Sequence, residues 1–262
     1  MSFEIIFPPE SVCNVSIEFL TSVFCMYLFD IGLKKLGDND KKRRWYLVHA
    51  IVNTIVAYLV FPDLIHVLKY PLNIAGINHY TLPLSLVLAL HVFHIIIDYK
   101  QMTIIDWVHH LVLSLFVGVV MMFLIRGPII NYGLFFLSGF PGGVDYYMLA
   151  LNKYGLLDRI TEKRVNVSLN MWIRLPGILS ICVIGYVNEV VGTTQNLPYR
   201  MPGIIYLMIL FNAGNAIFFA SRVTQNYGRK LERIAYLEGR KDKFTHKRKY
   251  ADSEADLDTY DN

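Results

Sequence analysis

The sequence predicts an all-α, polytopic membrane protein of about seven transmembrane helices, and three observations support this fold class. First, 54% of the 262 residues are hydrophobic and only 18% are charged, a balance that soluble domains rarely show. Second, the apolar residues form seven long runs separated by short polar connections. Third, the lysines and arginines gather in alternate connections, as expected of a chain that crosses a membrane repeatedly.

The seven expected spans follow one another as one membrane domain without an internal repeat. In chain order they cover residues 15–33, 45–68, 82–97, 104–125, 129–151, 169–191 and 202–220, most of them long enough to cross a bilayer as a helix. A short extracytosolic N-terminus, residues 1–14, precedes the domain of residues 15–222. Residues 223–262 form a basic and then acidic tail, a composition that predicts partial disorder.

Two stretches depart from this simple alternation of spans and loops. The fifth span contains Gly139-Phe140-Pro141-Gly142-Gly143 immediately before Asp145. A proline among glycines predicts a kink or an unwound turn, which membranes tolerate where the backbone lines a cavity or packs against protein. A packing kink and a functional kink both remain open. Residues 153–167 are charged and amphipathic, which predicts a loop or a surface helix.

The charge distribution predicts the orientation of the chain. If the N-terminus lies outside the cytosol, 21 of the 25 lysines and arginines fall in cytosolic segments. We therefore expect a lumenal N-terminus and a cytosolic C-terminus. Because the basic residues follow topology and do not form one face, nucleic acid is a poor candidate partner. The three cysteines, Cys13, Cys25 and Cys182, show neither metal nor redox spacing.

The fourth span carries the strongest candidate site, Asp106-Trp107-Val108-His109-His110. On an α-helix Asp106 lies three residues before His109 and four before His110, so its carboxylate can meet either imidazole on one face. Ionisable side chains at membrane depth are costly unless they face a polar cavity or a partner, which makes them functional candidates. The alternative is that neutral histidines simply tie this helix to its neighbours through hydrogen bonds.

Three kinds of chemistry use paired histidines inside a membrane. In acyl transfer one imidazole is nucleophile or general base, and a carboxylate, here Asp106 or Asp145, orients it. A metal site would use His91 and His94 of the third span as well, but one loose pair and one adjacent pair are fewer ligands than membrane di-iron oxygenases use. We therefore expect no metal. Retinal chemistry is excluded because the seventh span has no lysine for a Schiff base.

Two runs of the sequence resemble a known family. The run from Asp98 to Leu115, with its aspartate before a histidine pair, resembles the signature of the TRAM-LAG-CLN8 (TLC) domain family, nearest its ceramide synthase branch. The run from Gly143 to Gly155 is similar to the aspartate segment of that branch. The resemblance implies six helices around a lipid-accessible, tapered cavity, with the kinked fifth span bringing Asp145 toward His109 and His110.

It also implies a function in sphingolipid metabolism at the endoplasmic reticulum. The protein would transfer an acyl group from acyl-coenzyme A, a co-substrate, to a sphingoid base, without any other cofactor. The implied catalytic residues are His109, His110, Asp106 and Asp145. The residues expected to contact the substrate are His91, His94, Asp98, Trp107 and Tyr146. Coenzyme A, which is anionic, would approach the basic cytosolic segments.

Departures from that branch keep a second function open. Gly142 stands where a second aspartate would be expected, and Leu113 stands where a threonine would follow the histidine pair. The alternative is a non-enzymatic protein that binds or senses lipids or maintains the membrane. In both cases the expected partners are membrane lipids, and a homodimer remains open.

Overall fold

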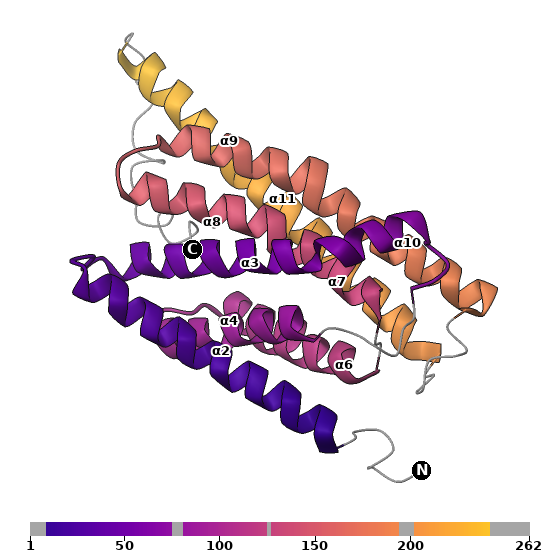
Figure 1. Ribbon diagram of the computed structural model, residues 1–262. Coiled ribbons are helices and arrows are strands. Elements are labelled where there is room, and N and C mark those ends of the chain that lie inside the picture. The colour runs from indigo at the N-terminus through magenta and orange to yellow at the C-terminus, as the bar shows by residue number, and fades with distance from the viewer. Residues whose placement is uncertain (1–8, 75–80, 125–126, 194–201, 242–262) are drawn as a thin grey trace.

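The computed structural model describes residues 9–74, 81–124, 127–193 and 202–241, and these residues form helices without any strand. Five of the helices are long and apolar enough to cross a membrane, and two shorter apolar helices accompany them. The fold class predicted from the sequence, an all-α polytopic membrane protein, is therefore confirmed (Figure 1).

The seven spans run back and forth along one axis. In chain order their elements are α2 (Pro9–Lys35), α3 (Lys41–Lys69), α4 (Leu82–Asp98), α5 (Ile104–Trp107), η1 (Val108–Phe116), α6 (Val117–Leu124), α7 (Pro128–Leu134), η2 (Phe135–Gly139), α8 (Phe140–Lys153), α9 (Arg159–Leu169), η3 (Asn170–Arg174), α10 (Leu175–Val191) and α11 (Pro202–Lys241). The fourth, fifth and sixth spans each contain a π-helical segment, η1, η2 and η3. Such segments are rare and occur frequently at functional sites.

One segment predicted from the sequence differs in extent. Residues 154–158 form a loop, as expected, but α9 begins at Arg159 and continues through η3 into α10 as one long helix, so the rest of the segment belongs to the sixth span. Its Glu162 and Lys163 are buried, and they form an ion pair of 3.5 Å that offsets part of the cost of burying each charge. The charges of this segment are therefore divided: Glu162 and Lys163 are buried, whereas Arg159 and Arg164 are exposed.

The terminal boundaries also differ. The tail predicted to begin at residue 223 is helical as far as Lys241, because α11 continues well beyond the predicted end of the seventh span. Residues 242–262, which include the acidic end, lie outside the described residues. At the other end α2 begins at Pro9, inside the predicted N-terminal segment of residues 1–14, and residues 1–8 are likewise outside the description.

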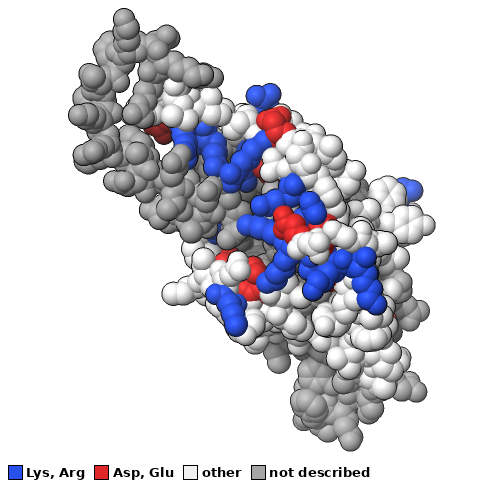
Figure 2. Space-filling model, turned by 90° about the vertical axis from the view of Figure 1, so that its left-hand side faces the viewer, with Lys and Arg blue, Asp and Glu red and all other residues white. Residues whose placement is uncertain are grey.

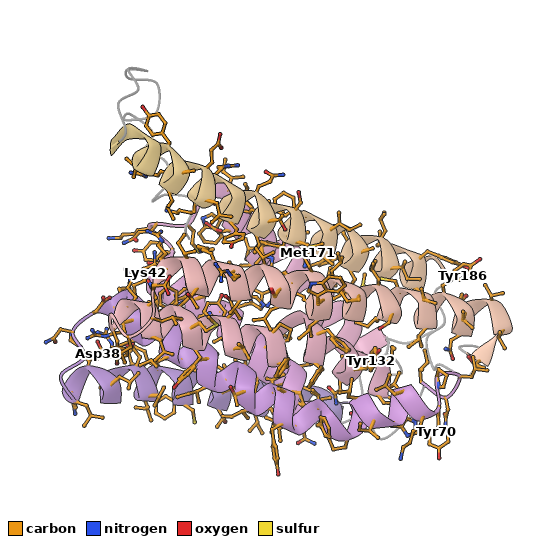
Figure 3. All side chains as sticks on the ribbon, turned by 90° about the horizontal axis from the view of Figure 1, so that it is seen from above. Asp38, Lys42, Tyr70, Tyr132, Met171 and Tyr186 are labelled. Atoms are coloured by element: carbon orange, nitrogen blue, oxygen red, sulfur yellow. The ribbon has the colours of Figure 1, made fainter. Side chains whose placement is uncertain are left out.

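Charged residues gather at one end of the bundle, called the charged end below. This end holds the connections between α2 and α3 and between α8 and α9, and Figure 2 looks onto it, with lysine and arginine side chains spread over its surface. Asp40 caps α3 by accepting hydrogen bonds from the backbone N–H groups of Lys42 and Arg43. Figure 3 shows Asp38 and Lys42 at this end and Tyr70 and Tyr186 at the opposite end.

The first span packs on the outside of the other six, mainly against α4 (Figure 1). Its two intramembrane carboxylates both find partners there. Glu18 accepts hydrogen bonds from the hydroxyl groups of Thr81 and Ser85. Asp30 forms a buried ion pair of 2.9 Å with Arg44 of α3. These contacts explain how a helix with two acids inside an apolar run is held against the bundle.

Glycines bring α8 and η2 close to α3. A methyl group added at Gly142 would lie 2.7 Å from Asn53 Nδ2, and one added at Gly143 would lie 2.9 Å from Thr54 Oγ1. The kink expected at Pro141 takes the form of the π-helical segment η2, after which Pro141 lies in the first turn of α8, where its missing N–H costs little. The close approach places the next turn of α8, which carries Asp145 and Tyr146, beside α3.

Candidate functional site

A cavity of about 370 Å³ lies inside the bundle and is lined by all spans except the first. Its lining residues come from α3, α4, the fourth span, the fifth span, the sixth span and α11, which matches the expectation that six helices surround a cavity. Five histidines share this lining, namely His49, His91, His94, His109 and His110. Their side chains come from three consecutive spans, so the packing of these spans against one another creates the cluster.

His110 is hydrogen-bonded to His91. Its Nδ1 lies 2.8 Å from Nδ1 of His91, so one ring donates and the other accepts. The ring of His94 packs edge-on against His110 with centroids 4.2 Å apart, and His109 lies 5.1 Å away by the same measure. Because Nδ1 of His110 is engaged, its Nε2 is the nitrogen left for a ligand, and His91 takes the orienting place that a carboxylate was expected to take.

Asp106 does not reach the histidine pair, contrary to the expectation from its spacing. Its Oδ2 accepts hydrogen bonds from the backbone N–H of Thr103 at 2.8 Å and from the Thr103 hydroxyl at 2.7 Å, forming a capping box at the start of the fourth span. The capping box satisfies backbone donors that would otherwise be unpaired. In addition, η1 begins at Val108, so the α-helical spacing behind the expectation does not apply to the histidines.

Asp145 lies on α8 and lines the same cavity as His109 and His110, as the kink was expected to arrange. It makes no hydrogen bond to a described residue, and its Oδ1 is buried without a partner. Arg174 of η3 also lines the cavity and interacts with Asp145 electrostatically, but the two form no direct ion pair. The cavity is therefore lined by an acidic side chain, Asp145, and a basic side chain, Arg174, that form no ion pair with each other.

Aromatic rings surround His49 at the charged-end side of the cavity. The ring of Trp45 lies 4.3 Å from that of His49 and 4.6 Å from that of His94. Tyr146, one of the residues expected to contact substrate, packs 4.6 Å from His49. The Nε1 atom of Trp45 is buried without a hydrogen-bond partner. These rings, tilted against one another, form an aromatic wall beside the histidine nitrogens.

A second cavity of about 270 Å³ adjoins the first at the charged end. Its wall includes Trp45, His94 and Asp106, which also line the histidine cavity. Asp98, expected to contact substrate, lines this second cavity and forms an ion pair of 3.2 Å with Lys41. Trp107, also expected to contact substrate, lines neither cavity.

Sequence reasoning missed part of the lining although a signal was present. His49 and Asn53 follow Trp45 at intervals of four residues on α3, and all three line the histidine cavity. On the sixth span, Asn166, Asn170 and Arg174 repeat the same interval. Polar residues four apart within an apolar span share one helix face, and that face must meet a cavity or a partner.

No group of three His, Cys, Asp or Glu side chains in the described part of the chain is arranged to hold a metal ion. Asp145, Arg174 and Asn215 line the histidine cavity, and each has a buried side-chain atom without a hydrogen-bond partner among the described residues. The same holds for the lining rings of Trp45, His94 and His109 and, outside the cavity, for Glu162. Native proteins leave few such atoms, so their concentration at one cavity indicates a polar ligand.

Comparisons with protein-family models, with curated proteins and with solved structures found no match for this chain.

Proposed function

We propose that the protein binds an amphiphilic lipid in the histidine cavity and transfers an acyl group from acyl-coenzyme A to a sphingoid-type amine, as the resemblance to TLC ceramide synthases implies. The observation that carries the lipid-binding part is a gradient along the cavity. On α4, His94 and His91 lie nearer the charged end, whereas Leu88 and Leu84 lie deeper, about 10 Å along the helix from His91 to Leu84.

The other lining spans repeat this order. In four spans a charged residue or histidine of the lining lies nearer the charged end than an apolar lining residue of the same span: Lys163 and Arg174 before Ile178, Asp145 before Leu137 and Leu134, His109 and His110 before Val117, and Arg222 before Phe211. A cavity with one polar and one apolar end suits a molecule of the same design, with its head among the histidines and its chain among the leucines and valines.

The arrangement of His110 supports the chemical part. A nucleophile or general base in acyl transfer needs a free ring nitrogen and a neighbour that fixes the tautomer. Nδ1 of His91 lies 2.8 Å from Nδ1 of His110, and when His110 Nδ1–H donates this hydrogen bond, the lone pair of Nε2 is left for the acyl carbon or for the proton of the amine. The polar head and the thioester would enter from the charged end, which the positive-inside rule assigns to the cytosol and, with the resemblance, to the cytosolic face of the endoplasmic reticulum.

The test is an assay of the purified full-length protein with hexadecanoyl-coenzyme A and sphinganine, with the amide product detected by mass spectrometry. The wild-type protein should form the amide, and His110→Ala should abolish product while leaving the thermal melting temperature nearly unchanged. His66→Ala is the matched control, because His66 lies near the opposite end and does not line the cavity. Product formation by His110→Ala at the wild-type rate would disprove the assigned chemistry.

A second candidate function, lipid binding or sensing without catalysis, is favoured by one specific observation. In the described part of the chain no carboxylate hydrogen-bonds to a histidine of the cavity, because Asp106 is held by Thr103 and Asp145 is unpaired. The same assay separates the two functions. Stoichiometric retention of lipid without any amide product, by a protein that melts cooperatively, would favour the non-enzymatic function.

A further inference from the structure

The cavity face of the sixth span carries a row of polar side chains that the proposed chemistry has not used. Asn170 Nδ2 donates to the side chain of Asn166 at 2.6 Å and to its backbone carbonyl at 2.9 Å. Arg174 Nη1 donates to Asn170 Oδ1 at 2.9 Å. Both asparagines are buried, so the row holds the guanidinium of Arg174 in one orientation from its own helix.

The guanidinium keeps unused donors. Nη1 makes the only hydrogen bond of Arg174 in the described part of the chain, and Nε is buried without a partner. The side chain is partly exposed, and it lines the histidine cavity. Arginine remains charged in proteins, so a guanidinium at this depth cannot avoid its desolvation cost by losing a proton. An oxygen atom from a ligand would satisfy the donors that the protein leaves free.

A purely structural role for Arg174 would be to neutralise Asp145. Such a role is best served by a direct ion pair, like the one between Asp30 and Arg44 at 2.9 Å. Arg174 and Asp145 attract each other electrostatically without such contact, and both line the histidine cavity together with His109. The guanidinium therefore shares with Asp145 and His109 the border of the space in which a lipid head would lie.

We propose that Arg174 binds the acyl carbonyl oxygen of the lipid in the cavity, with Asn166 and Asn170 positioning its guanidinium. This inference rests on the proposed function, since it assumes an acyl lipid in the histidine cavity. To that function the proposal adds Arg174 as the side chain that recognises the acyl carbonyl. When the nitrogen of the amine adds to the carbonyl carbon of the thioester, the carbon–nitrogen bond forms and the π pair of the carbonyl moves to the oxygen. Arg174 stabilises that negative oxygen, as donors in an oxyanion hole do. When the carbonyl re-forms, the carbon–sulfur bond breaks, coenzyme A leaves as the thiolate, and the proton of the amine passes to His110.

The experiment compares two probes that differ at the carbonyl alone, methyl hexadecanoate and hexadecyl methyl ether. Equilibrium binding of each probe to the purified full-length protein in detergent gives a ratio of affinities. Micelle partitioning cancels when this ratio is compared between variants. Arg174→Gln should lower the preference for the ester by about tenfold to a hundredfold, as loss of a hydrogen bond to a charged group predicts. Arg164→Gln is the matched control, because Arg164 is exposed and does not line the cavity.

A double variant, Asp145→Asn with Arg174→Gln, controls for misfolding because it removes both charges together and leaves neither of them unpaired. It should lose the preference for the ester over the ether to the same extent as Arg174→Gln. An unchanged ester preference in both variants would overturn the proposal. An equal loss of affinity for ester and ether would also overturn it and leave Arg174 as a counter-charge. Free hexadecanoate serves as a third probe. If Arg174→Gln lowered the affinity for hexadecanoate but left the affinities for the ester and the ether unchanged, the proposal would be overturned in favour of a site for a free carboxylate.

The binding readout separates this proposal from the proposed function. If the wild-type protein binds neither probe, the lipid-binding function fails and the Arg174 site fails with it. If the wild-type protein binds both probes and the ester preference does not depend on Arg174, only the Arg174 site fails. If the ester preference depends on Arg174 but no amide product forms in the assay with sphinganine, the site stands and acyl transfer fails.

Discussion

Polar residues occur inside two regions of this membrane bundle, and the two regions treat them differently. Along α2, and at the end of the bundle opposite the charged end, polar side chains are paired: Glu18 with Thr81 and Ser85, and Asp30 with Arg44. Around the histidine cavity, by contrast, Asp145 and other lining residues keep polar atoms without partners. This difference separates polar residues that hold helices together from polar residues that are available to bind a ligand.

The buried ion pair should give the largest effect on stability. Asp30→Asn leaves Arg44 buried without its counter-charge, and breaking a buried pair in this way costs about 3–5 kcal/mol. Thermal unfolding of the purified protein should show a large fall in melting temperature. The double variant Asp30→Asn with Arg44→Met should recover much of the loss, because it leaves no unpaired charge. A melting temperature unchanged in Asp30→Asn would mean that this pair does not hold α2 to α3.

Two asparagines give a direct comparison of the regions. Asn131 Nδ2 donates to Asp63 Oδ2 at 2.6 Å, so Asn131→Leu should destabilise the protein by about 1.5–3 kcal/mol. Asn215 lines the cavity and its Oδ1 has no partner, so Asn215→Leu should change stability by less than about 0.5 kcal/mol while weakening lipid binding. Melting temperatures and lipid affinities of both variants provide the test. Equal destabilisation by the two substitutions would erase the distinction between the regions.

The glycine contact between α8 and α3 should respond to a single methyl group. Gly142→Ala places a carbon 2.7 Å from Asn53 Nδ2 in a packed interface, and such overpacking typically costs about 1–3 kcal/mol. Gly185→Ala is the control, because nothing lies within 4 Å of the added carbon and alanine favours a helix. Thermal melting should therefore fall for Gly142→Ala and stay equal or rise for Gly185→Ala. The opposite order would contradict the close packing of these helices.

The smallest effect is expected at the charged end, outside the membrane. The Arg43 guanidinium and the Tyr154 hydroxyl, which donate to Asp38, hold the pKa of that carboxyl below its usual value of 3.8. A lowered folded-state pKa stabilises the fold above the unfolded value, and that contribution disappears as the pH falls below about 4. Arg43→Met should therefore make melting less dependent on pH below 4 than it is in the wild type. Identical pH profiles for the two proteins would contradict this contribution.

The sequence was enough to predict the seven spans because apolar length is a local property. It did not predict that α9 is part of the sixth span, because the charges of Glu162 and Lys163 are buried by tertiary packing that composition does not show. The sequence singled out the histidine pair, which lines the cavity, but not the hydrogen-bond partner of His110. His91 bonds to His110, and Asp106 is held by the helix start, because the π-helical segment η1 changes the spacing on which the α-helical expectation relied.

The most direct test of the central claim is a map of the protein in lipid nanodiscs that shows where a bound lipid lies. The account predicts chain density among Leu84, Leu88 and Leu134, with the polar head beside His110 and Arg174. A lipid lying in the reverse direction, with its head at the leucines, would contradict this prediction. A map that shows lipid bound elsewhere on the protein but only water in the cavity would contradict it as well.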